Sequence, residues 1–161
     1  MSDYRVRVAT HADAEAIVRH RIGMFEDMGV EMDRGLTARS FGRWLDHALL
    51  SGLYRAWVVE TGTGEIVAGG GITVLPWPPG PRYPGEQLAF VYNLYTDPAH
   101  RRRGLGRQIM DAIHSWCREA GISSLALNAS DAGRPLYESL GYRVSPSPMM
   151  FLGLAQEDRF R

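Results

Sequence analysis

The segment 97–107 combines three consecutive arginines, Arg101, Arg102 and Arg103, with two glycines, Gly104 and Gly106. Glycine lets the main chain approach a ligand closely and adopt backbone angles that other residues avoid. Main-chain N–H groups at the start of a helix, with the helix dipole behind them, attract anions. The arginines raise the local positive potential. The segment therefore predicts a site for a pyrophosphate group.

Two common phosphate-binding motifs do not match this segment. A P-loop requires Gly-Lys-Ser/Thr, which does not follow here. A dinucleotide fingerprint requires a third glycine or an alanine where this chain has Ile109. On the loop alone, a tight strand-to-helix turn with solvated arginines is the alternative interpretation.

The elements that must position this loop follow from hydrophobic spacing. An apolar run precedes it at 88–96, and a helical pattern follows it at 105–121. Thr37 is the expected cap of an earlier helix, Gly52 marks its end, and the glycines at 69–71 indicate a bulge or a close backbone approach. The other expected strands are 4–8, 54–60, 66–75, 124–128, 142–144 and 149–154, and the other expected helices are 10–29, 37–52 and 131–140. This order predicts an α/β layered domain with a mixed sheet.

The pattern Arg101-x-x-Gly104-x-Gly106 resembles the R/Q-x-x-G-x-G/A coenzyme A motif of the GNAT (Gcn5-related) N-acetyltransferase superfamily. Three further segments are similar to that family in the same order, namely 94–98, 125–128 and 134–142, the last matching its closing LYxxLGF/Y signature. The close match covers about residues 88–144. The resemblance implies a single acetyltransferase domain over 1–161, of α/β (α+β) class, with a mixed, mostly antiparallel central sheet and helices on both faces.

The resemblance also implies an activity and a cosubstrate. The chain would transfer an acetyl group from acetyl-CoA to a primary amine of a small molecule or peptide, by direct attack in a ternary complex and without a metal. The pantetheine arm would lie between two splayed strands, and the loop amides would hold the pyrophosphate. The cofactor-binding residues implied in this way are Leu94, Tyr95, Thr96, Arg101, Arg102, Arg103, Gly104, Leu105, Gly106, Arg107 and Asn128.

Tyr137 is the catalytic residue that the resemblance implies. A thiol has a pKa near ~8.5 and a tyrosine near ~10, so a neighbouring tyrosine can donate a proton to a departing thiolate. The alternative is a helix tyrosine that packs on the core with its hydroxyl exposed. For Asn128 the alternative is a residue of the turn at a strand end.

The general base is left open by the sequence. Some family members have a glutamate on the strand equivalent to 88–96, where this chain has Phe90 and no carboxylate. The candidates are Glu86, Tyr92 acting through water, Glu26, Asp27, Glu31, or a water chain. The missing glutamate supports an alternative function, a catalytically weak CoA-binding sensor of the same fold.

The acceptor is also left open. Acidic residues near the first interhelix loop, such as Glu31 and Asp33, would attract a cationic amine if they form a rim around the acceptor site. Trp77 and Tyr83, on a proline-rich loop, would form an acceptor wall or pack against a second subunit. Four apolar side chains would line an adaptable pocket or belong to the core: Met24, Phe25, Met28 and Met32.

Bulk composition limits the remaining partners. The 161 residues carry 18 Lys and Arg against 18 Asp and Glu, so no net charge draws the chain to nucleic acid or to an acidic membrane. The single cysteine, Cys117, excludes an internal disulfide and fits a cytoplasmic location. No signal peptide or membrane span is predicted, and the five histidines show no metal-ligand spacing. A homodimer is an expected state, since dimers are frequent in the family.

Overall fold

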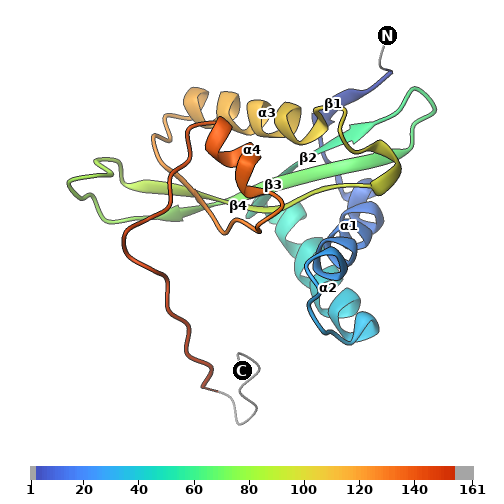
Figure 1. The fold of residues 1–161 in the computed structure, drawn as a ribbon, viewed down its shortest axis with the longest axis horizontal. Coiled ribbons are helices and arrows are strands. Elements are labelled where there is room, and N and C mark those ends of the chain that lie inside the picture. Colours follow the sequence, from blue (N-terminus) through green and yellow to red (C-terminus); the bar gives the residue numbers. More distant parts are fainter. Residues whose placement is uncertain (1–2, 155–161) are drawn as a thin grey trace.

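The structure, a computed structural model, describes residues 3–154. Its centre is a five-stranded sheet whose strands lie in chain order (Figure 1): β1 (Arg5–Val8), β2 (Tyr54–Glu60), β3 (Ile66–Pro76), β4 (Gln87–Thr96) and β5 (Leu125–Leu127). The strands β1 to β4 pair antiparallel, and β5 runs parallel to β4.

Helices cover both faces of this sheet (Figure 1). One face packs against α1 (Ala14–Asp27) and α2 (Arg34–Ser51), and the other against α3 (Leu105–Glu119) and α4 (Arg134–Ser139). Short 3-10 turns, η1 (His11–Asp13) and η2 (Pro98–His100), precede α1 and α3. The predicted fold class, a mixed and mostly antiparallel sheet between two helical layers, is confirmed.

Alternation along β2 shows how one strand serves both layers. Tyr54, Ala56 and Val58 belong to the core beneath α1 and α2, whereas Trp57 and Val59 belong to the core beneath α3. All five are nearly inaccessible to solvent. Such alternation follows from the two-residue period of a strand that is covered on both faces.

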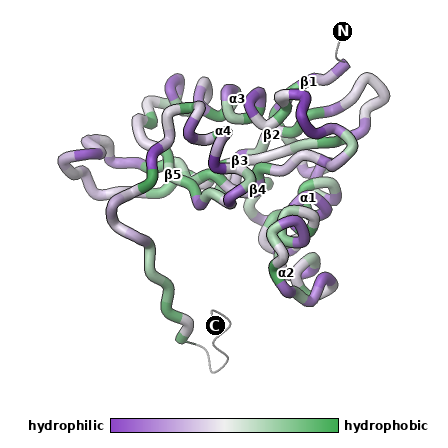
Figure 2. The backbone as a smooth tube through the Cα atoms, viewed as in Figure 1, coloured by the Kyte–Doolittle hydropathy of each residue, from purple (hydrophilic) through white to green (hydrophobic). Residues whose placement is uncertain are grey.

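The predicted amphipathic helix after the glycine loop is α3. Its buried side chains recur every three or four residues and face the sheet: Leu105, Ile109, Met110, Ile113 and Cys117. Figure 2 shows the apolar strands beneath this helix, whose other face is hydrophilic. Cys117 packs as a small hydrophobic residue, and burial raises the pKa of its thiol to about 11. Truncating a side chain such as Ile113 to alanine should cost about 2–5 kcal/mol of stability.

The start of α2 differs from the prediction. Asp33, not Thr37, caps the helix, because its side chain accepts a hydrogen bond of 2.9 Å from the amide of Leu36. Thr37 lies one turn inside the helix, where its amide bonds to the carbonyl of Asp33 at 2.9 Å. The predicted end at Gly52 is confirmed by its left-handed φ of 76°.

The two strands predicted at 142–144 and 149–154 are wrong. The structure has no strand in either segment. The chain after α4 leads away from the sheet (Figure 1), although its end at 149–154 is mostly apolar (Figure 2). A strand needs a neighbouring edge with which to exchange main-chain hydrogen bonds, and apolar side chains do not provide one. Met150 and Leu152 are 89% and 81% exposed.

Candidate functional site

The site begins where β4 and β5 separate. Their pairing is confined to Ala89, Phe90 and Val91 of β4, opposite Leu125–Leu127. From Tyr92 to Thr96, β4 continues without a partner on that side. A cavity of about 1020 Å³ opens along this stretch, between β4 and the segment that links β5 to α4.

A bulge in β4 sits beside this gap. The register with β3 shifts between Gly69 and Gly71, and Asn93 has a left-handed φ of 60°. A Cβ on Gly70 would lie 3.0 Å from a methyl carbon of Leu94 and 3.2 Å from one of Ile109. The predicted bulge or close approach at residues 69–71 is therefore confirmed, and glycine is needed because side chains of β4 and α3 pack directly against this backbone.

Free amides surround the start of α3. The amides of His100 and Arg101 bond to the carbonyls of Asp97 and Pro98, at 2.9 and 3.3 Å. Those of residues 102–107 have no hydrogen-bond partner among the described residues. Arg102 and Gly104 adopt left-handed angles, with φ of 62° and 76°, which turn the loop into the helix. Unpaired amides at the positive end of a helix are an arrangement that suits an anion.

The three arginines have different surroundings. Arg101 donates from Nε to the carbonyl of Thr96 at 3.0 Å, and its guanidinium forms an ion pair with Asp27. The same guanidinium lies 5.5 Å from the centre of the Tyr95 ring. Arg102 and Arg103 have no side-chain partner among residues 3–154. Arg101 therefore joins the loop to α1, whereas Arg102 is free to face a ligand.

The structure brings most of the predicted cofactor residues to one cavity. Seven of the eleven line it, namely Leu94, Tyr95, Thr96, Arg101, Arg102, Gly106 and Asn128. Arg103, Gly104 and Arg107 lie in the loop or at the start of α3 but do not line it, and Leu105 is buried in the core. A Cβ on Gly106 would lie 3.2 Å from Leu136, so this position is closely packed as well as close to the cavity.

Tyr137, on α4, lines the same cavity. It is 9% exposed, and its ring meets that of Tyr142 edge to face at 5.8 Å. Burial raises the pKa of its hydroxyl, so the group carries its proton at neutral pH. Its neighbour Tyr142 is bonded through its own hydroxyl to His114 at 2.8 Å.

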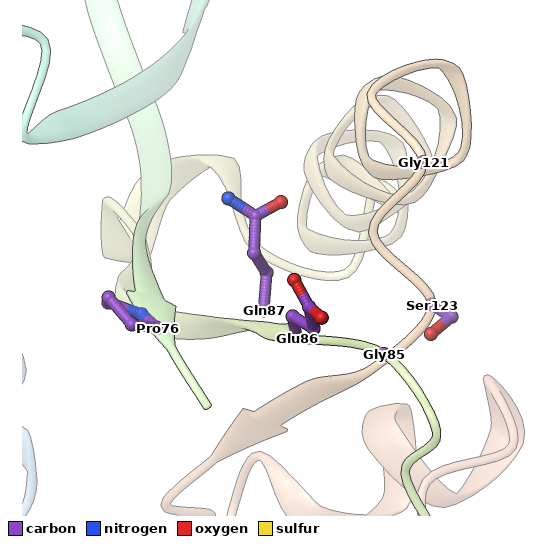
Figure 3. Close-up of a pocket in the computed structure, with 6 residues that line it drawn as sticks. All are labelled: Pro76, Gly85, Glu86, Gln87, Gly121 and Ser123. Carbon is purple, nitrogen blue, oxygen red and sulfur yellow. The ribbon is translucent and has the colours of Figure 1, made fainter. Parts of the chain in front are cut away.

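The candidate bases are placed differently by the fold. Glu86 lines a separate pocket of about 420 Å³ with Gly121 and Ser123 (Figure 3) and is not in the main cavity. Glu26 and Glu31 do not line that cavity either, and Glu26 is bonded to Arg34 at 2.6 Å. Asp27 does line the main cavity, but it is paired with Arg101 of the loop. Tyr92 also lines the cavity, and burial raises the pKa of its hydroxyl.

Several expectations about the acceptor change. Three of the four carboxylates of the expected acidic rim are already engaged, because Asp27 and Glu26 form ion pairs and Asp33 caps α2. The fourth, Glu31, does not line the cavity. Trp77 and Tyr83 do not line the cavity, so the interpretation as an acceptor wall is not supported. Met24, Phe25 and Met28 do line it, in agreement with the adaptable pocket that their types suggested, whereas Met32 does not.

Sequence reasoning missed two charged residues of the cavity, Arg21 and Asp131. A lone arginine in an amphipathic helix normally points to solvent, so no local signal marks Arg21. Here its guanidinium stacks on the rings of Phe25 and Phe41, 4.8 and 4.6 Å from their centres, and donates to Asn93. Residues 3–154 contain no cluster of three His, Cys, Asp or Glu side chains that could hold a metal ion. No helix in this range has the length and apolar character to cross a membrane.

Comparison with known proteins agrees with this geometry. The family model described as an acetyltransferase (GNAT) domain matches residues 52–144, which is more than half of the chain. The crystal structure of a GCN5-related N-acetyltransferase from Ralstonia eutropha JMP134 has a TM-score of 0.83 and 34% identity, covering 92% of this chain and 98% of that one. The chain therefore belongs to the GNAT acetyltransferase family, a family of acyltransferase enzymes.

Other relatives cover less of the sequence or share the fold alone. A predicted acetyltransferase from Clostridium acetobutylicum, crystallised with acetyl-CoA, has a TM-score of 0.83 at 23% identity over 92% of this chain and 96% of its own. The glucosamine 6-phosphate N-acetyltransferase of Trypanosoma brucei brucei is 28% identical over 40% of this chain. A Bacillus subtilis (strain 168) protein named as an acetyltransferase is 36% identical over 35% of it. The matches span 44% and 38% of the lengths of these two curated relatives.

Proposed function

We propose that this chain transfers an acetyl group from acetyl-CoA to a primary amine of a small molecule or peptide, by direct attack in a ternary complex. The observation that carries the proposal is the gap between β4 and β5, which opens into one cavity bordered by the glycine loop and by Tyr137. Acetyl-CoA has three parts that need different surroundings: an anionic pyrophosphate, an extended amide-bearing arm and a reactive thioester.

Each part has a suitable partner in the chain. The unpaired amides of residues 102–107 suit the pyrophosphate, with the positive charge of Arg102 beside them. The main chain of β4 from Tyr92 to Thr96 lacks a strand neighbour on the β5 side and can hydrogen-bond the amide-bearing arm there as an added strand. The amide of Asn128, on the opposite side of the gap, would support the arm or the thioester.

The chemistry proceeds by attack of the amine nitrogen on the thioester carbonyl carbon. A C–N bond forms, the C–S bond breaks, and the electron pair leaves with sulfur as a thiolate. The Tyr137 hydroxyl would donate its proton to that thiolate, since burial keeps the phenol protonated. The tyrosinate left behind regains a proton from the ammonium or from water.

The amine must first lose its own proton. An alkyl amine with a pKa near ~10 is mostly protonated at pH 7, and exposing its lone pair costs about 4 kcal/mol. Among the groups that line the cavity, Tyr92, Asp27 and Asp131 can accept hydrogen bonds from an ammonium or its water. We propose that water bonded to these groups carries the proton to solvent.

We propose further that the whole chain, 1–161, acts as one acetyltransferase domain in the cytoplasm.

A second function, a CoA-binding sensor with little turnover, is favoured by one observation: β4 carries no carboxylate. Phe90 stands where some family members have a glutamate that acts as the general base. Calorimetry with acetyl-CoA, followed by thiol release with a panel of amines, separates the two functions. Binding with release above the hydrolysis rate supports the transferase, and binding without it supports the sensor. The absence of any heat with acetyl-CoA or CoA would overturn both.

A further inference from the structure

Arg21 is a charged group that the proposed cofactor site does not use. It lies on α1 and lines the part of the cavity beneath that helix, together with Met24, Phe25 and Tyr92. The glycine loop and the β4–β5 gap, which suit coenzyme A, form the other part of the cavity. The wall beneath α1 is therefore left for the acceptor.

The guanidinium of Arg21 is held in a defined orientation. The rings of Phe25 and Phe41 stack on it from α1 and α2, at 4.8 and 4.6 Å. Its Nη1 donates to the side-chain carbonyl of Asn93, whose amide in turn donates to the hydroxyl of Tyr54 at 3.1 Å. The left-handed bulge at Asn93 places this amide in the buried interior, at 7% exposure.

These partners are neutral, so the charge of Arg21 is not balanced. No ion pair to Arg21 occurs among the described residues. The carboxylate on its own helix that faces the cavity, Asp27, is already paired with Arg101. Burial lowers the pKa of Arg21, although an arginine stays protonated at neutral pH. A partly desolvated cation without a carboxylate favours a ligand that supplies a negative charge.

The geometry points to Arg21 as the binding residue for an anionic group of the acceptor, a carboxylate or a phosphate, so that the substrate is an amine that also carries a negative charge. This inference rests on the proposed transferase function. One N–H of the guanidinium is used by Asn93, which leaves the remaining donors for a bidentate contact with two oxygens. The apolar side chains Met24, Phe25, Met28 and Phe90 surround the rest of the acceptor.

This inference reverses the expectation of an acidic rim that attracts a simple cationic amine. Polyamines and other amines without an acidic group would place a second positive charge near Arg21, which is unfavourable. An amine that bears a carboxylate or phosphate would place its ammonium toward the thioester and its anion toward α1. The positive charge thus selects both the class of acceptor and its orientation.

Matched acceptors test the inference on the unmodified protein. The first arm compares phenylalanine, which carries a carboxylate, with phenylalanine amide and phenethylamine, which lack it. The second arm compares glucosamine 6-phosphate with glucosamine, which lacks the phosphate. We expect the anionic member of at least one arm to have a kcat/KM about 10- to 100-fold above its neutral partner, the range of a charge-assisted contact. The arm that responds identifies the carboxylate or the phosphate. Neutral partners that react as well or better in both arms would overturn the inference while leaving the transferase function intact.

Variants then assign the selectivity to Arg21. Arg21→Met should remove the preference for the anionic acceptor by lowering its kcat/KM relative to that of its partner without the acidic group, and should leave the acetyl-CoA dissociation constant unchanged. Arg21→Lys should restore part of the preference. Arg55→Met is the matched control, because Arg55 also stacks on an aromatic ring, that of Trp116 at 4.7 Å, but lies outside the cavity. If Arg21→Met instead loses as much affinity for acetyl-CoA as it loses preference for the anionic acceptor, the residue belongs to the cofactor site.

A binding measurement covers the case in which no acceptor is turned over. Calorimetry of the CoA complex with phenylalanine and with glucosamine 6-phosphate should detect heat for one of them in the unmodified protein and in Arg55→Met, but not in Arg21→Met. A lack of heat with both compounds would overturn the inference. A lack of thiol release with retained anion binding would count against the transferase function alone.

Discussion

Arg101 and Asp27 form an ion pair that joins the loop before α3 to the end of α1. The same arginine holds the carbonyl of Thr96 at the last residue of β4. Arg101, the first residue of the coenzyme A motif, thus lines the cavity with its side chain already bonded to protein groups. It connects the wall proposed for the cofactor with the helix proposed for the acceptor.

This arrangement predicts unequal roles for two adjacent arginines. Arg102→Met should raise the acetyl-CoA dissociation constant about tenfold or more, since a charge-assisted contact is lost. Arg101→Met should raise it by less than about threefold, because exposed ion pairs such as that with Asp27 contribute little. Calorimetry at a fixed salt concentration measures both values. An equal or larger loss in Arg101→Met would contradict the distinction.

Substitutions at Gly104 should weaken acetyl-CoA binding to an extent that depends on the charge of the new side chain. The φ of 76° at Gly104 puts about 1 kcal/mol or more of strain on any replacement, but the space around its Cβ is open. Gly104→Asp should therefore weaken acetyl-CoA binding at least about 100-fold by placing a carboxylate at the anion site. The isosteric and neutral Gly104→Asn, a residue that tolerates this conformation, should lose only a few-fold. Similar losses in both variants, at similar melting temperatures, would argue against a pyrophosphate at this loop.

Tyr137→Phe tests the proposed proton donor. Turnover should fall about 100-fold or more, the usual contribution of a positioned acid, while the acetyl-CoA dissociation constant stays within about twofold. The control is Tyr142→Phe, which removes a hydroxyl bonded to His114 and not facing the cavity. Its turnover should match that of the unmodified protein. Full activity in Tyr137→Phe would exclude this tyrosine from the mechanism.

The burial of His20 predicts that the free energy of unfolding depends on pH. Burial lowers the pKa of His20 from the ordinary 6.5 to about 4, with Asp97 and Arg19 as its charged neighbours. The unfolded chain binds a proton as the pH falls through 6.5, whereas the folded chain does not until about 4. The unfolded state therefore gains protons first, and the free energy of unfolding should fall by about 2–3 kcal/mol between these values.

Denaturant titrations at several pH values between 7 and 4 measure this decline. His20→Gln should flatten it, because glutamine cannot take up a proton, even if the variant is less stable at every pH. The exposed His47 provides the control, and His47→Gln should leave the slope unchanged. A slope that is the same in all three proteins would assign the acid sensitivity to other groups.

Local patterns were sufficient for most of the elements. The strand over residues 54–60 and the ends at Gly52 and Gly121 follow from residue types that act over a few positions, such as β-branched side chains and left-handed glycines. The cap of α2 was misplaced because Asp33 and Thr37 both have capping side chains, and only the helix register selects between them. The two terminal strands were wrong because strand pairing depends on a distant edge.

The sequence by itself determined the glycine loop, the apolar strand before it, the helix after it and the position of Tyr137, since each is encoded in contiguous residues at a regular spacing. Only the tertiary structure decided which charges remain available. It paired Asp27 with Arg101, moved Glu86 to a separate pocket and left Arg21 between two rings without a carboxylate. The physical reason is that the availability of a charge depends on its neighbours in space, and those neighbours come from segments that only folding brings together.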